Sequence, residues 1–198
     1  MKNKKNKLSV SNASDAQIKA SLRAWIRCAS AENVASGLAW YGEAQAFCQS
    51  LAKEFDLPAY IVASVVSMLS PNNKWERNKI DARAVIIAWQ NGLGAESVKV
   101  CTYTINKLKA FRALNEGERI ASSAPKTHAF AMNVGLLSSE HITIDKWHIR
   151  ACLVKPKDGV TDTVETVTAR QYRRIEAITA QIAKESGLKG YELQAIVW

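Results

Sequence analysis

Apolar residues recur at intervals of three and four along almost the whole chain, and this helical period constrains the fold more than any other feature. In the first such run, Ile18, Leu22 and Ile26 fall on one helical face, just after the N-cap candidates at residues 12–15. The stretch 142–144 could be mistaken for a strand, but it is too isolated to build a sheet. The pattern predicts an all-α protein, with residues 142–144 as an extended entry into a helix.

Turn residues divide this pattern into separate helices. Pro58 and the run Ser-Pro-Asn-Asn at 70–73 interrupt it in the first half, and Gly92 and Gly94 end a later segment. The expected helices span residues 15–30, 35–55, 58–69, 75–90, 98–114, 127–137, 146–153, 169–185 and 191–198.

Length and charge limit the classes of protein. With 198 residues and 47% hydrophobic content the chain can bury a core, either as one domain or as two small packed lobes. The 27 Lys and Arg against 18 Asp and Glu give a net charge of +9, which favours a polyanionic partner such as nucleic acid. Residues 1–12 read as a basic, flexible tail, either solvated or adding phosphate contacts.

The four cysteines lie far apart, with no C-x-x-C pair and no Cys/His cluster at metal-ligand spacing. We therefore expect free thiols in a reducing cytoplasm and no metal site. Neither a signal peptide nor an 18-residue apolar run free of charge is visible in the sequence, so we expect no membrane association.

Two segments carry the most informative motif. Residues 120–133 read Ile-Ala-Ser-Ser-Ala-Pro-Lys-Thr-His-Ala-Phe-Ala-Met-Asn, and residues 142–150 read Ile-Thr-Ile-Asp-Lys-Trp-His-Ile-Arg. Together they resemble the signature of the helix-hairpin-helix DNA glycosylases of the endonuclease III type, in which a hairpin ends in a lysine and a second helix follows an aspartate. By this resemblance Lys126 matches the Schiff-base lysine and Asp145 the aspartate shared across the family.

The resemblance implies a fold and an activity. It implies two helical lobes with a groove between them, one from residues 13–57 plus 150–198 and the other from 58–149, the second holding the hairpin at about 115–137. It also implies a monomeric DNA glycosylase or abasic-site lyase without a cofactor, acting on a damaged or modified base in double-stranded DNA. The closest likeness is to small phage-encoded relatives, so the expected location is the host cytoplasm.

The chemistry explains the residue types. A glycosylase flips its base out of the stack and breaks a bond whose transition state is cation-like at the sugar, which a carboxylate such as Asp145 stabilises. An amine such as that of Lys126 can attack the same carbon and form an iminium intermediate, which permits strand cleavage.

The residues expected to contact DNA surround this pair. Asn72 matches a polar residue that helps to fill the gap left by a flipped base. The turn before Lys126 and the helix after Asp145 supply the phosphate contacts. The expected DNA-binding residues are Asn72, Asn73, Ser122, Ser123, Thr127, Lys146, Trp147, His148 and Arg150.

The sequence departs from the family at the hairpin. Ser122 and Ala124 stand where the pattern has glycines, so either positive φ angles are strained there or the turn has another shape. The iron–sulfur cysteine cluster of some members is also missing. We therefore expect no iron–sulfur cofactor, but the resemblance to the family stands, because many members lack this cluster as well. Trp147 is bulkier than the usual residue and could stack on a base or sugar.

Structural roles compete with each of these interpretations. Lys126 could be a solvated helix-start lysine, Asp145 an N-cap alone, and the Asn72–Asn73 pair a loop closure. His148 could contact a phosphate or be buried and hydrogen-bonded. For the whole chain, a non-catalytic DNA-binding or inhibitor protein, a base-modifying enzyme and a protein-interaction module remain alternatives.

Overall fold

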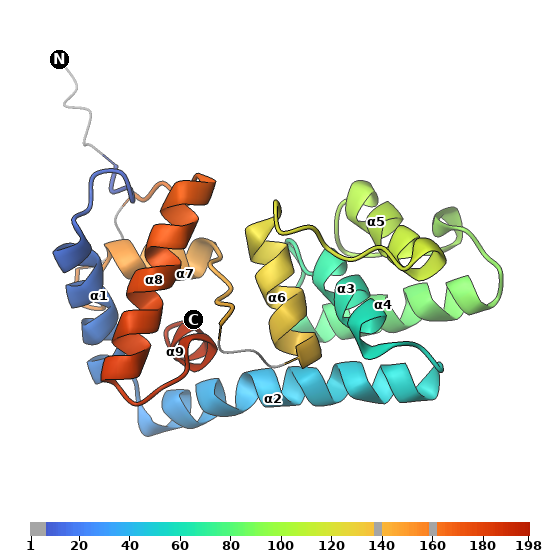
Figure 1. Ribbon diagram of the computed structural model, residues 1–198, viewed down its shortest axis with the longest axis horizontal. Coiled ribbons are helices and arrows are strands. Elements are labelled where there is room, and N and C mark those ends of the chain that lie inside the picture. The colour runs from blue at the N-terminus through green and yellow to red at the C-terminus, as the bar shows by residue number, and fades with distance from the viewer. Residues whose placement is uncertain (1–6, 137–139, 159–161) are drawn as a thin grey trace, which may run out of the picture. The chain divides into compact units, whose positions relative to one another are not determined.

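The computed structural model describes residues 7–136, 140–158 and 162–198, and the regular secondary structure of these ranges is helical (Figure 1). Their only strand-like feature is an isolated parallel bridge between Leu8 and Thr163. The all-α class predicted from the helical period is therefore confirmed for the described part of the chain.

The chain divides into two compact units. Unit 1 comprises Met1–Tyr41 with Ser139–Trp198, and unit 2 comprises Gly42–Ser138. The first boundary falls inside α2 (Ala31–Glu54), whereas the sequence placed it at 57/58. Proline marks where a helix stops, but a long helix can belong to two units, which local sequence does not reveal.

Unit 1 contains the first part of α2 together with α1 (Asp15–Cys28), α7 (Lys146–Leu153), α8 (Ala169–Glu185) and α9 (Gly190–Ile196). Helix α1 packs against α7 and α8, and α8 packs against α9. Their amphipathic faces meet in one apolar core, as the periodicity predicted. Its fully buried side chains include Ile18, Leu22, Ile142, Ile175, Ile182 and Leu193.

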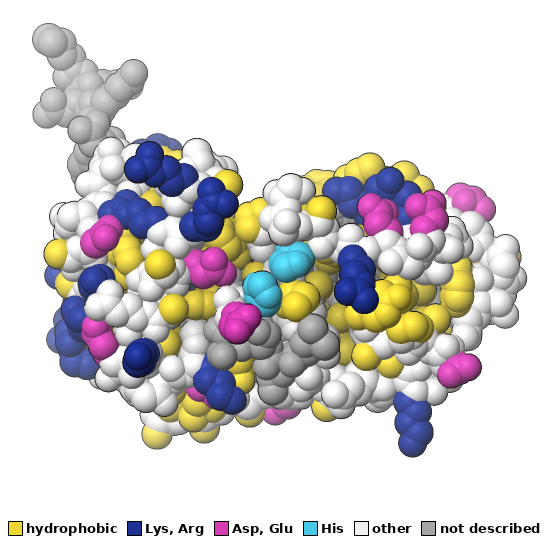
Figure 2. Space-filling view, viewed as in Figure 1, with side chains coloured by type: hydrophobic (Ala, Val, Ile, Leu, Met, Phe, Trp, Pro, Cys, Tyr) yellow, Lys and Arg dark blue, Asp and Glu magenta, His cyan; other side chains and the backbone are white. Residues whose placement is uncertain are grey.

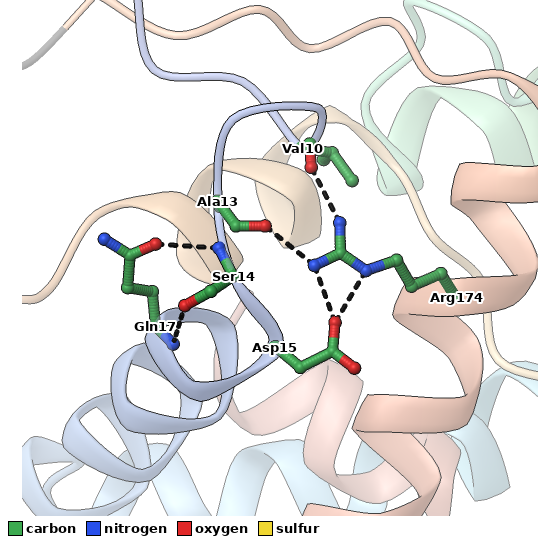
Figure 3. A network of polar contacts seen from close by, with 6 residues as sticks. All are labelled: Val10, Ala13, Ser14, Asp15, Gln17 and Arg174. Carbon is green, nitrogen blue, oxygen red and sulfur yellow. Dashed lines mark hydrogen bonds and ion pairs between the residues drawn. The ribbon is translucent and has the colours of Figure 1, made fainter.

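The N-terminal segment is tied to unit 1 by Arg174 of α8 (Figure 3). The guanidinium donates to the carbonyls of Val10 at 2.8 Å and Ala13 at 2.7 Å and to the carboxylate of Asp15. Val10 is buried, and Leu8 forms the bridge with Thr163. The tail expected over residues 1–12 is thus wrong for residues 8–12, because a distant arginine orders them; residues 1–6 lie outside the described ranges.

Unit 2 is built around α3 (Ala59–Leu69), which contacts α4 (Trp75–Gln90), α5 (Thr104–Glu116) and α6 (Pro125–Leu136) (Figure 1). Every residue of α3 from Ile61 to Leu69 is buried. This agrees with its nearly unbroken apolar sequence, which is typical of a helix covered on most sides.

Two helix starts differ clearly from the sequence-based boundaries. Helix α2 begins at Ala31, whereas the expected helix begins at residue 35. The helix expected from residue 98 begins only at Thr104, and a short 3₁₀ turn, η1 (Ala95–Ser97), precedes the non-helical residues 98–103. Cys101 N–H donates to the carboxylate of Asp81 at 2.7 Å and so cannot join a helical ladder. Helix α6 starts at Pro125, a favoured first helical residue, while the expected end at residue 137 lies outside the described ranges.

Candidate nucleic-acid interface

The N-terminus of α6 presents Lys126 in its first turn. The Lys126 and Thr127 side chains are half-buried, and the preceding residues 121–124 are exposed. Ser67, buried in α3, donates its hydroxyl to the Thr127 carbonyl at 2.7 Å. This bond fixes the start of α6 to the end of α3, so the position of the Lys126 backbone is well determined within unit 2.

The turn before Lys126 is unstrained. Ala124 N–H donates to the Ala121 carbonyl at 3.0 Å, and Ser122 and Ser123 are exposed. Neither Ser122 nor Ala124 has a positive φ. Of the two possibilities left by the missing glycines, the structure therefore shows a turn of another shape, without backbone strain.

The loop at residues 70–74 lies at the same end of α3 as the start of α6. Asn72 is exposed and adopts a left-handed φ of 58°, which asparagine tolerates, and its amide donates to the Tyr103 hydroxyl at 2.5 Å. The Asn73 amide instead donates to the Leu69 carbonyl at 3.2 Å and to Asp81 at 2.9 Å. Asn73 therefore closes the loop, and Asn72 with Tyr103 forms its exposed surface.

Asp81 holds this region together, and the sequence analysis missed it. Its side chain is almost completely buried and accepts hydrogen bonds from Asn73, from the Arg77 guanidinium at 2.7 Å and from Cys101 N–H. The signal was present in the sequence, since an aspartate lies on the same face of α4 as Ala82 and Val85. A carboxylate on an apolar helical face needs internal partners, because burying an unpaired charge is costly.

The N-terminus of α7 presents Asp145 in unit 1. Asp145 is the N-cap, and its carboxylate accepts from His148 N–H at 2.8 Å. The preceding residues 142–144 are extended, as predicted, because the Tyr172 hydroxyl donates to the Ile142 carbonyl at 2.7 Å and accepts from Ile144 N–H at 3.1 Å. Asp145 therefore does cap α7. Its carboxylate is half-buried at the N-terminal end of that helix.

Beside Asp145, three side chains form what we call the α7 platform: Lys146, Trp147 and Arg150. Trp147 is 45% exposed, and the Lys146 ammonium and the Arg150 guanidinium carbon each lie 5.1 Å from the centroid of its ring. Arg150 also pairs with Glu165, which orients its guanidinium. An exposed indole between two cations suits a ligand that carries both aromatic and negative groups, as nucleic acid does.

His148 does not belong to this surface, so the expectation that it contacts DNA is wrong. It is fully buried, and its Nε2 lies 2.9 Å from the Thr179 hydroxyl of α8. Burial lowers the pKa of His148 to about 4, so the ring is neutral at pH 7. Of the two interpretations of the sequence, the buried, hydrogen-bonded histidine is the one observed, because residue 148 faces α8 on the inner side of α7.

The low pKa of His148 predicts acid sensitivity. In the unfolded chain the pKa of the histidine is near its ordinary value of 6.5, so below that pH the unfolded state binds a proton that the folded state does not bind. We expect the free energy of unfolding to fall by about 2 kcal/mol between pH 7.5 and pH 5 from this group alone. Urea unfolding of the wild type and of His148→Gln at both pH values measures the difference. An equal loss of stability in both proteins would contradict this account.

The charges of the surface are mixed. Lys and Arg side chains are spread among Asp and Glu side chains on the visible faces of both units (Figure 2). The described residues contain no group of His, Cys, Asp and Glu arranged to hold a metal ion. No helix in the described ranges is long and apolar enough to cross a bilayer.

Residues 3–198 match the model of a family of unknown function, DUF7178, and the chain belongs to this family. No curated protein and no solved structure matches the chain.

Proposed function

We propose that this DUF7178 member is a DNA glycosylase that excises a damaged or modified base from duplex DNA, with Asp145 and Lys126 as its catalytic residues. The observation that carries the proposal is the N-terminus of α7. There a carboxylate lies next to an exposed tryptophan and two cations, Lys146 and Arg150. At that helix end the two cations complement phosphates, the indole complements an unstacked base, and the carboxylate complements a cation-like sugar.

In this mechanism the two helix N-termini divide the chemistry. The Asp145 carboxylate stabilises positive charge at the sugar C1′ as the bond to the base breaks. The amine of Lys126 forms a bond to C1′, and the base departs with the bonding electrons and takes up the proton that the amine loses. Protonation of the ring oxygen then opens the sugar ring and gives an iminium. The iminium acidifies the C2′ proton, and loss of that proton to water with departure of the 3′ phosphate cleaves the strand. Lys126 lies at the N-terminus of α6 in unit 2, and Asp145 lies at the N-terminus of α7 in unit 1.

A second candidate is a DNA-binding protein without catalytic activity. The turn at residues 121–124 favours it, because this turn lacks the glycines and the positive φ angles that bring successive backbone N–H groups onto one phosphate. Retention of both Lys126 and Asp145 favours the enzyme. The two candidates differ in whether any base is released.

The test of the enzyme is release of a base from a panel of duplexes carrying oxidised, alkylated, deaminated or enzymatically modified bases, with an undamaged duplex as the control. We expect release from at least one modified duplex and none from the undamaged one. DNA binding without release from any duplex would favour the binding protein, and absence of both would refute a DNA-directed function.

The α7 platform has its own prediction. Trp147→Ala is expected to weaken DNA binding about tenfold, since stacking on an aromatic ring contributes roughly 1–3 kcal/mol per base, whereas Trp147→Phe keeps most of the affinity. Fluorescence anisotropy with labelled duplex measures both. The matched control is Trp198→Ala, because Trp198 is also about half exposed in unit 1 but packs on Trp40. An equal loss of affinity at Trp198 would count against the platform.

A further inference from the structure

The arginine of the α7 platform is held by a carboxylate that lies outside α7. Glu165 pairs with the Arg150 guanidinium, and the same carboxylate oxygen accepts a hydrogen bond from the Thr163 hydroxyl at 3.1 Å. Within the described ranges, Glu165 is the only acidic partner of Arg150. The direction in which Arg150 points therefore depends on where residues 163–165 place this carboxylate.

The segment that carries Glu165 is fixed by the N-terminal residues. Leu8 N–H donates to the Asp162 carbonyl at 2.9 Å, and Val164 N–H donates to the Leu8 carbonyl at 2.8 Å. These two bonds form the parallel bridge and hold the backbone on both sides of Thr163. Thr163 is thus a fixed hydrogen-bond donor beside Glu165.

The N-terminal residues are in turn attached to α8. Arg174 donates to the carbonyls of Val10 and Ala13 (Figure 3), and the Val10 side chain is buried in the core of unit 1. A continuous series of hydrogen bonds and short backbone segments therefore runs from α8, through residues 8–13, to Arg150. Every member of this series belongs to unit 1.

This attachment matters because arginine is long and has many rotamers, and a single surface ion pair restricts them little. Here the guanidinium is paired with Glu165 while its carbon lies 5.1 Å from the centroid of the Trp147 ring, and the Arg150 Nε atom is buried. Indole and cation are thereby presented as one preorganised surface. Preorganisation lowers the entropic cost of binding a ligand such as an unstacked base.

We propose that Glu165 is a positioning residue of the α7 platform, held in place by residues 8–13, and that it enables the platform to distinguish an unstacked base from a paired one. The inference rests on the proposed function, since it concerns how this surface meets DNA. Glu165 acts through Arg150 and Trp147 and does not contact the DNA, because its carboxylate repels phosphates. The N-terminal segment is then part of the DNA-binding unit.

The first test needs no DNA. Heteronuclear NMR of the full chain follows the Nε–H of Arg150, which is buried and therefore protected from exchange with water, and Arg150→Lys assigns its signal. The ring current of Trp147 displaces this signal, and Trp147→Ala gives its position without the ring. Glu165→Ala is expected to move the signal most of the way to that position. Glu165→Gln keeps an acceptor and should move it less.

Glu185→Ala is the matched control. It removes the carboxylate that pairs with Arg23, whose side chain is 43% exposed like that of Arg150, and it changes the net charge by the same amount as Glu165→Ala. The Arg150 signal should stay in place in this variant. Movement equal to that in Glu165→Ala would overturn the proposal, because the effect would then come from charge alone.

The hold of the N-terminal segment is tested at Leu8. Leu8→Pro removes the N–H that donates to Asp162, so it should move the Arg150 signal in the same direction as Glu165→Ala. Leu8→Ala keeps that N–H and should leave the signal unchanged. A signal that stays in place in either Leu8→Pro or Glu165→Ala would overturn the proposal.

Fluorescence anisotropy then measures discrimination, with a labelled duplex that carries one bulged adenine and the same duplex fully paired. Glu165→Ala is expected to lower the ratio of the two affinities about fivefold, because the ring is no longer held for stacking. Glu185→Ala should leave this ratio within about twofold of the wild type, since charge acts on both probes alike. In an Arg150→Ala background, Glu165→Ala should have no further effect on the ratio.

The outcomes separate this inference from the proposed function. A wild type that binds both probes equally, or a full effect of Glu165→Ala in the absence of the Arg150 side chain, would overturn the inference. A wild type that binds neither probe, together with the expected movements of the Arg150 signal, would refute the proposed function but support the hold of Glu165 on Arg150.

Discussion

Lys126→Ala is expected to abolish the covalent adduct that borohydride traps between the protein and DNA from which a base has been removed. The adduct requires an iminium between an amine and C1′, and alanine cannot form one. Affinity for the same DNA is expected to stay within about threefold of the wild type, because loss of one phosphate contact changes affinity modestly. Gel electrophoresis of the trapped complex and anisotropy of the uncut complex measure the two quantities.

The matched control is Lys109→Ala, which removes an exposed lysine of α5 in the same unit. It should leave adduct formation unchanged. Asp145→Asn keeps the helix cap but removes the negative charge, so it should slow base release about a hundredfold while DNA remains bound. An adduct that persists in Lys126→Ala would exclude Lys126 as the nucleophile. Base release by a wild type that forms no adduct would indicate water as the nucleophile instead.

Much of the secondary structure could be predicted because it depends on local sequence. The helices at residues 75–90, 146–153 and 169–185 have the predicted ends, since caps and apolar faces lie within a few positions of one another. Thr168, for example, caps α8 and forms a capping box with Gln171. Such signals can be recognised from a few neighbouring residues, without reference to the rest of the chain.

Two of the differences from the expected structure have a common cause, which is a contact with a residue far away in sequence. Residues 98–103 stay outside the helix because Asp81, 20 positions before Cys101, accepts the Cys101 N–H. Residues 8–12 are held in place because Arg174 binds the carbonyls of Val10 and Ala13. A helical period or a run of lysines cannot report these contacts, since each is created only when distant elements pack together.

In the candidate site, too, local features could be predicted from the sequence and contacts between distant residues could not. That Asp145 caps a helix and Lys126 lies at the start of one could be predicted from the sequence, because both are properties of a helix end. The sequence could not decide whether His148 lies at the surface, since that depends on how α8 packs on α7 through Thr179. Nor could it show that Asn72 contacts Tyr103, a residue that the motif comparison did not single out.

The stability of the loop at residues 70–74 is predicted to depend on Asp81. Asp81→Ala should lower the free energy of unfolding by about 3–5 kcal/mol, because it removes a buried carboxylate and leaves its donors without an acceptor. The donors are the Asn73 amide, the Arg77 guanidinium and the Cys101 N–H. Urea unfolding followed by circular dichroism at pH 7.5 measures the change.

The control for this prediction is Glu76→Ala on the same helix. The Glu76 side chain is 78% exposed and pairs with Lys79 at 2.8 Å, so its removal should cost less than about 0.5 kcal/mol. Asp81→Asn should fall between the two, because an amide keeps the shape and one acceptor but loses the charge. If Asp81→Ala proves no more destabilising than Glu76→Ala, the three hydrogen bonds do not organise the loop, and Asn72 and Tyr103 must be positioned by other contacts.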